Sequence, residues 1–232
     1  MRYLAINICI LLALLCGLAH ADSSGTSINA GTCVSQEKLA QLQAAATHDD
    51  LYAVRDLDVY YSSCVGDRDK AMTYAKQKAL IGTAEDVSSY ATALESREGP
   101  KAAFPWYLKA AQMGESGAKL YVARAYRDGE VVKADPVQAL MWFELGATCQ
   151  EFGMTDMQEL AEFLWKNKPV PLAGPKALAW LTVVSNRTDG LIPYYKSMQT
   201  DIQKNLSETE LEISTQLAGE YRFTSGCSSG DK

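Results

Sequence analysis

Apolar residues recur at helical spacing along most of the chain. Leu51, Val54, Leu57 and Tyr61 fall on one stripe of a helix, and a similar stripe lies between residues 87 and 94. The segments between such stripes carry Gly, Pro and capping residues, and none shows the two-residue alternation of a strand. The pattern therefore predicts an all-α chain of short helices.

The expected helices follow one another closely. They cover approximately residues 35–46, 50–65, 69–80, 84–98, 100–113, 117–127, 136–147, 155–165, 177–184, 193–204 and 207–221.

Several helix ends have recognisable signals. We expect Thr83 and Asp135 to be N-caps, and Gly129 to adopt a left-handed conformation after a helix. Capping boxes are predicted for two pairs three residues apart, Thr155 with Gln158 and Ser207 with Glu210.

An internal repeat organises the helices. Trp106, Trp142 and Trp180 are spaced by 36 and 38 residues, and Tyr74 occupies the equivalent position 32 residues before Trp106. An alanine lies three positions before each ring, on the same helix face: Ala71, Ala103, Ala139 and Ala177. A period near 35 residues with two helices per period is typical of an α-solenoid, in which each helix pair buries its apolar face on the next.

Three stretches, residues 106–114, 126–135 and 139–143, resemble the Sel-1-like repeat (SLR), a relative of the tetratricopeptide repeat. The similarity extends from about Ala103 to Ala147 and is weaker on both sides. It implies an α/α solenoid of about four SLR-type helix pairs with N- and C-terminal capping helices. Pro105 departs from the pattern, so we expect that helix either to begin near Phe104 or to be kinked.

The first 21 residues resemble a secretory signal peptide, with Arg2, an apolar run from residue 6 to 18, and an Ala-His-Ala cleavage site. Lipidation at Cys16 is the weaker alternative, because Leu15 before it is not small. We expect a mobile leader at 22–34, the repeat domain at 35–225 and a tail at 226–232. The predicted location is periplasmic or secreted, with no membrane insertion of the mature chain.

Four cysteines remain after the signal: Cys33, Cys64, Cys149 and Cys227. In an exported protein they suggest two disulfides, for which three pairings exist. Cys33 and Cys64 flank a predicted antiparallel hairpin, which favours their pairing and leaves Cys149 for Cys227. A zinc site would need close pairs such as C-x-x-C, which the sequence lacks, so we expect neither metal nor cofactor.

Candidate catalytic residues are few. His48, the one histidine of the mature chain, stands beside two aspartates, where a loop role is the simpler interpretation than a general base. Ser35 with Lys38 and Ser116 with Lys119 match a Ser-x-x-Lys pattern without its partner motifs. Because some secreted cysteine-rich SLR relatives are described as β-lactamase-like, a β-lactamase or cell-wall hydrolase is the alternative function.

The leading hypothesis is a non-catalytic scaffold that binds another protein. The formal net charge is −6, or about −7 without Arg2, and the sequence shows no basic patch, which argues against nucleic acid. Tyr and Arg are enriched at binding hot spots. On that basis the candidate contacts are Tyr90, Arg97, Tyr121, Arg124 and Arg127, although packing between repeats is the favoured explanation for each tyrosine taken alone.

The SLR resemblance suggests a toxin as the partner. Small exported SLR proteins of Gram-negative bacteria include immunity proteins that block membrane-targeting phospholipase toxins. A third possible function is a structural assembly factor for envelope or polysaccharide machinery. The sequence does not separate a toxin partner from an envelope complex.

Overall fold

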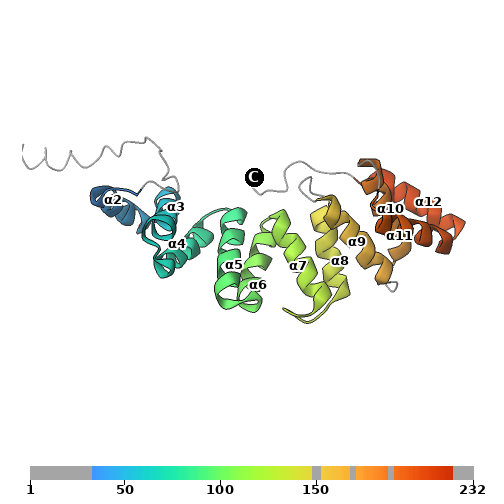
Figure 1. Cartoon of the computed structure of the whole chain (residues 1–232), viewed down its shortest axis with the longest axis horizontal. Helices are drawn as coiled ribbons and strands as arrows, with labels where there is room; N and C mark the ends of the chain where they lie inside the picture. Colours follow the sequence, from blue (N-terminus) through green and yellow to red (C-terminus); the bar gives the residue numbers. More distant parts are fainter. Residues whose placement is uncertain (1–32, 148–152, 168–170, 188–190, 222–232) are drawn as a thin grey trace, which may run out of the picture.

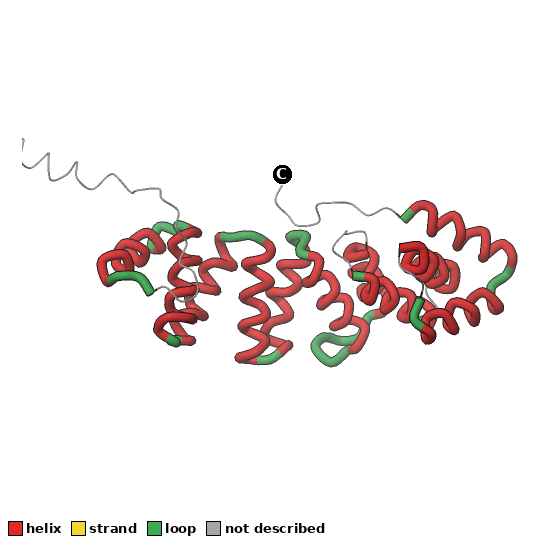
Figure 2. The backbone as a smooth tube through the Cα atoms, turned by 45° about the horizontal axis from the view of Figure 1, so that its top comes forward, coloured by secondary structure: helices red, strands yellow, loops and turns green. Residues whose placement is uncertain are grey.

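A computed structural model describes residues 33–147, 153–167, 171–187 and 191–221. These residues form a long row of short helices that lie across the long axis of the molecule (Figure 1), joined by tight loops (Figure 2). No strand occurs among them. The all-α prediction is therefore confirmed for the described part of the chain.

The helices begin and end close to the predicted positions. They are α2 (Gln36–Ala46), α3 (Leu51–Val59), the π-helical turn η1 (Tyr60–Val65), α4 (Arg68–Ile81), α5 (Ala84–Glu98), α6 (Pro100–Gln112), α7 (Ser116–Asp128), α8 (Pro136–Ala147), α9 (Met154–Lys166), α10 (Ala173–Arg187), α11 (Pro193–Asn205) and α12 (Glu208–Glu220).

Packing divides the helices into four pairs with helices at both ends. The pairs are α3 with α4, α5 with α6, α7 with α8, and α9 with α10, and each pair packs on the next. At the ends, α2 packs on α3, while α11 and α12 pack on α10. This is the predicted solenoid of four pairs with capping helices. We call α3, α5, α7 and α9 the A layer, and α4, α6, α8 and α10 the B layer.

The repeated alanine and aromatic positions build the core as predicted. All four alanines of the repeat are buried, and three of them, Ala103, Ala139 and Ala177, have no exposed surface. Trp142 and Trp180 are buried as well. Small side chains let neighbouring helices approach, and the large rings fill the space beside them.

Most helix ends follow the local signals. The hydroxyls of Thr83 and Ser207 each accept a hydrogen bond from the backbone N–H three residues later, within capping boxes. Asp135 Oδ1 accepts from two backbone N–H groups at 3.0 Å, as an N-cap does. Gly129 has φ +74°, and a Cβ at that position would lie 2.9 Å from Ala134 Cβ, so glycine is required there.

Two predicted helix starts were wrong. The N-cap of α9 is Gly153, whose backbone N–H donates to the Asp156 carboxylate at 3.0 Å, and the predicted capping box of Thr155 with Gln158 does not begin the helix. α10 begins at Ala173, four residues before the predicted Ala177. The two helices begin one and four residues before the predicted starts, because capping and the first turn do not require an apolar stripe.

The expectation that the helix containing Pro105 begins near Phe104 is wrong. α6 begins at Pro100 and continues through Pro105 to Gln112. Pro105 is exposed, so its ring faces solvent. Proline has no backbone N–H, so the carbonyl of residue 101 lacks its usual partner at position 105. Because this lost hydrogen bond lies within the first two turns, the rest of the helix is unaffected.

The N-terminal end has its own small core. Leu42, Val54, Leu57 and Tyr61 are among its buried residues, which form a cluster separate from the main one. A disulfide joins Cys33, just before α2, to Cys64 in η1, with Cα atoms 5.6 Å apart. That distance is ordinary for a disulfide, and the pairing is the one favoured from the sequence.

Cys149, Cys227, the predicted signal peptide, most of the leader and the predicted tail lie outside the described residues. The pairing of Cys149 with Cys227 therefore stays a prediction. One described contact brings the end of α12 back onto α10: Tyr221, six residues before Cys227, stacks on Trp180 with ring centroids 4.1 Å apart. We expect non-reducing peptide mapping to find the 149–227 cross-link; free thiols at both positions would contradict it.

Within the described residues, no helix is both long and apolar enough to cross a membrane.

Candidate functional site

The five predicted contact residues come from two helices of the A layer, α5 and α7. Tyr90 is buried and meets Trp106 of α6 edge-on, with ring centroids 4.7 Å apart, so packing within its own helix pair accounts for its position. Arg97 pairs with Asp69 of α4 at 2.8 Å. Tyr121, Arg124 and Arg127 are only partly buried, and they lie along one helix at helical spacing.

Tyr121 belongs to a compact polar cluster between α5, α6 and α7. Its ring stacks on Tyr107, with centroids 3.7 Å apart. Both phenols donate to one carboxylate, that of Glu95, at 2.8 Å from Tyr121 and 2.9 Å from Tyr107. Burial and the adjacent Glu95 raise the pKa of Tyr121, so its hydroxyl stays protonated and keeps donating.

Arg124 and Arg127 join α7 to α9. Arg124 makes a two-pronged contact with Glu159, through Nε at 3.0 Å and Nη2 at 2.5 Å, and also contacts Asp156 at 3.3 Å. Arg127 pairs with Glu159 and with its neighbour Asp128. Such forked Arg–carboxylate pairs combine charge with fixed geometry, so they set the distance and register of the two helices.

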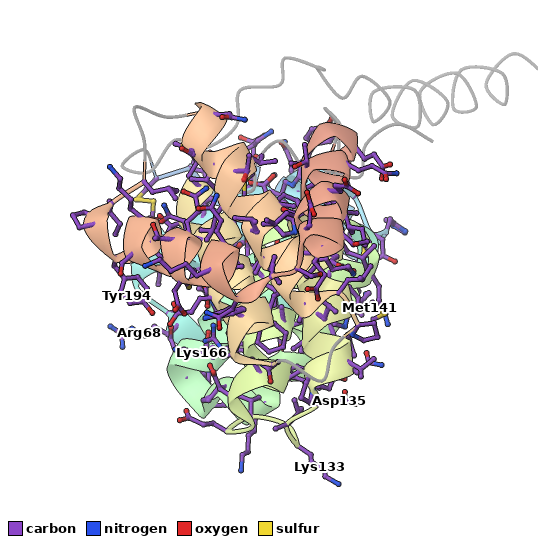
Figure 3. All side chains as sticks on the ribbon, turned by 90° about the vertical axis from the view of Figure 1, so that its right-hand side faces the viewer. Arg68, Lys133, Asp135, Met141, Lys166 and Tyr194 are labelled. Atoms are coloured by element: carbon purple, nitrogen blue, oxygen red, sulfur yellow. A yellow bond between two sulfur atoms is a disulfide. The ribbon has the colours of Figure 1, made fainter. Side chains whose placement is uncertain are left out.

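Equivalent contacts link every pair of successive helices along this side of the solenoid. Arg55 of α3 pairs with Asp86 of α5 at 2.7 Å, and Tyr194 of α11 donates to Glu162 of α9 at 2.9 Å. With the Tyr121 and Arg124 contacts they make a ladder from α3 to α11. Seen end-on, Lys166 and Tyr194 lie on one side of the molecule and Met141 of α8 on the other (Figure 3).

The acceptors of this ladder were missed at the sequence level. Glu95, Glu159 and Glu162 were not singled out, although each lies 26 to 35 residues from its donor. That separation is close to one repeat. A search for opposite charges one period apart on aligned helices would have found Arg124 and Glu159.

The ladder makes stability depend on pH. Burial of Glu159 works to raise its pKa, but hydrogen bonds from Arg124 and Arg127 outweigh burial, and the net pKa lies below the usual 4.5. The stabilisation is therefore fully present above about pH 4.5 and is lost as the pH falls through the lowered pKa. We expect Glu159→Gln to lower Tm near neutral pH and to weaken its fall in acid, measured by thermal unfolding at a series of pH values.

Glu212→Gln, at an exposed site on α12, is the matched control and should leave the fall of Tm in acid unchanged. An identical fall of Tm in acid for Glu159→Gln and for the unmodified chain would contradict the role given to Glu159.

The candidate catalytic residues lie in ordinary helix, N-cap and turn positions. Ser116 is the first residue of α7, and Lys119, three residues later, is buried. His48 is exposed in the turn after α2, and Ser35 is the N-cap of that helix. Among the described residues no group of three or more His, Cys, Asp or Glu side chains could hold a metal. The hydrolase alternative stays a prediction, which a covalent penicillin adduct at Ser116 would support.

The fold and its A-layer ladder define a helical repeat scaffold. Comparison of the sequence with protein-family models and with curated proteins found no match.

Comparison with solved structures found c5321, a protective antigen present in uropathogenic Escherichia coli strains, whose crystal structure displays an SLR fold. The match has a TM-score of 0.56 and 22% sequence identity, and it covers 79% of this chain and 40% of that protein. This chain thus spans less than half the length of c5321. The solenoid described above has the SLR fold.

Proposed function

We propose that this chain is an exported, non-catalytic scaffold that binds another protein through the open side of its A layer. The observation that carries the proposal is the ladder of side-chain links, which holds the A-layer helices α3, α5, α7 and α9 in a fixed register. A surface ordered before binding loses little conformational entropy when a partner docks.

The chemistry of the A layer suits a protein partner. Arg124 keeps 42% of its side chain exposed even while bound to Glu159, and Tyr121 is also accessible. On the neighbouring helix α5, Ser89, Thr92 and Ser96 are exposed and provide hydroxyl groups. Tyr and Arg anchors surrounded by small polar groups are common in protein interfaces.

Within this class, we propose a periplasmic immunity protein that neutralises a phospholipase-type antibacterial toxin. The support comes from the SLR fold, the Cys33–Cys64 disulfide, which suits an oxidising compartment, and the signal-like N-terminal sequence. An envelope assembly complex is the other partner that the same surface would fit.

The test is co-expression with a phospholipase-type toxin encoded beside the chain. We expect the two proteins to co-purify and the chain to protect cells from the toxin. Ser89→Arg, which places a bulky cation at an exposed A-layer position, should weaken binding at least tenfold, or about 1.4 kcal/mol. Gln112→Arg, at an exposed position of α6 in the B layer, is the control and should bind normally.

Two results would contradict the proposal. A chain that binds no such toxin and protects no cell removes the immunity function. Equal loss of binding in Gln112→Arg and Ser89→Arg would argue against the A layer as the interface.

A further inference from the structure

One side of α8 is apolar and exposed. Val137, Met141 and Leu145 are four residues apart on this helix, so their side chains lie in one row along it. The exposed fractions of the three residues are 72%, 40% and 46%. Single exposed apolar residues are common on proteins, but a row of three on one helix makes a continuous apolar surface. We call these three residues the α8 stripe.

The repeat gives the equivalent row on every B helix, because the aligned aromatic positions set the register. On α4 and α6 the equivalent row is polar apart from one proline, and its middle residue is exposed on both helices. On α10 the equivalent row is apolar, and all of it is buried. The α8 stripe thus combines the apolar character of a covered row with the exposure of an open one. The equivalent residues are Asp69, Thr73 and Gln77 of α4, Lys101, Pro105 and Lys109 of α6, and Pro175, Ala179 and Val183 of α10.

The cover over α10 is provided by α12. α10 packs on α9 before it and α11 after it, as α8 packs on α7 and α9, and α12 is the additional helix that packs on α10. Leu206, just before α12, lies so close to α10 that a Cβ added to Gly174 would be 2.7 Å from Leu206 Cδ2. Tyr221, just after α12, stacks on Trp180. Both ends of α12 therefore rest on α10.

α12 shows which kind of segment covers such a row. Leu211, Ser214, Ala218 and Tyr221 recur at helical spacing on one side of this segment. Ser214 is buried, and the other three are partly buried against the main core. The exposed residues of α12 are polar or glycine. The cover is therefore an amphipathic helix with small and apolar residues toward the B layer.

The α8 stripe adjoins this covered surface. Lys176 of α10 pairs with Glu144 of α8 at 2.6 Å. Glu144 directly precedes Leu145, and Lys176 directly follows Pro175, so the open row and the covered row are neighbours in the B layer. α12 adds a layer about 10 Å thick over α10. A broad flat surface would meet α12 before it reached α8, whereas a single helix could lie on α8 beside α12.

We propose that the α8 stripe binds an amphipathic helix of a partner protein, which lies beside α12 and continues the layer that α12 begins. Such a helix places apolar side chains at helical spacing on the apolar surface of its receptor. The charges on both sides of the stripe define its polar flanks. α12 carries four glutamates and no base, while the equivalent row of α6 carries two lysines. The partner helix should therefore carry bases on the flank toward α12 and acids on the flank toward α6. This interface goes beyond the proposed function, which uses the A layer.

The test is titration of the full chain into a fluorescently labelled helical peptide of about 20 residues, followed by anisotropy. The peptide carries a single row of leucines at helical spacing, with lysines on one flank and glutamates on the other. We expect saturable binding of this peptide and none of a peptide of the same composition whose leucines are spread around the helix.

Two variants of the chain locate the interface. Met141→Glu and Val137→Glu should each weaken peptide binding at least tenfold, because each places an unpaired charge within the apolar contact. Thr73→Glu adds the same charge at the equivalent, exposed position of α4 and is the matched control, which should bind as the unmodified chain does. Thermal unfolding of each variant verifies that it is folded.

The outcomes separate this proposal from others. Absence of binding, equal binding of the two peptides, or equal loss in Thr73→Glu and Met141→Glu would overturn it. A dimer of the unmodified chain that Met141→Glu dissociates, detected by light scattering, would also overturn it and would assign the α8 stripe to a second copy of the chain. Ser89→Arg should bind the peptide normally, so failure of the A-layer interface leaves this result unchanged.

Discussion

Replacing Phe143 by alanine should destabilise the fold by about 3 to 5 kcal/mol. Phe143 lies on α8 with no exposed surface and packs against Phe163 of α9, with ring centroids 5.5 Å apart. The ring therefore fills the boundary between the third and fourth helix pairs. Its removal leaves a cavity where a solenoid is sensitive, since each repeat is stabilised by its neighbours. Urea unfolding followed by circular dichroism measures the loss.

Met141→Ala is the matched control. Met141 lies on the same helix, two residues earlier, with 40% of its surface exposed, and its truncation should change stability by less than about 1 kcal/mol. Similar effects of the two substitutions would contradict the assignment of Phe143 to the boundary between repeats.

Removing the Cys33–Cys64 disulfide is expected to destabilise the N-terminal end by about 3 to 4 kcal/mol. The bond joins two cysteines that lie 31 positions apart in the sequence, so it closes a loop that contains α2 and α3. The buried residues of these helices belong to a separate small cluster. The double variant Cys33→Ser, Cys64→Ser should therefore lose protection against amide hydrogen exchange in α2 and α3. Protection in α5 to α10 should change little, because stability in repeat proteins is largely a nearest-neighbour property.

The unmodified chain under a reducing agent provides an independent comparison, and it should reproduce the pattern of the double variant. Uniform loss of protection along the whole solenoid would show instead that the N-terminal end and the repeats unfold as one unit.

The repeat itself could be predicted from the sequence because its signals are local. The Ala–Trp spacing places both residues on one helix face, and Asp135 followed by Pro136 begins a helix with groups only a few residues apart. The wrong prediction of a capping box at Thr155 has the same local origin, because two overlapping capping patterns compete there. The carboxylate of Asp156 accepts from Gly153 N, whereas Gln158 was expected to accept from Thr155 N.

The candidate site could be predicted only in part. Arg124 and Arg127 were chosen as exposed contacts, and the structure places both on Glu159, 35 and 32 residues away. Nothing within α7 indicates that partner. The contact depends on the position of α9 relative to α7, both along the helix axis and in rotation about it. Packing of the intervening α8 sets that position.

By itself, the sequence determined the helices, the period near 35 residues and the small residue beside each large ring, since all of these are properties of spacing within one helix or one turn. Only the tertiary structure decided which charges meet across repeats and which remain exposed. The clearest case is Glu159, which meets Arg124 and Arg127 although they lie 35 and 32 positions away in the sequence, because α7, α8 and α9 pack in order.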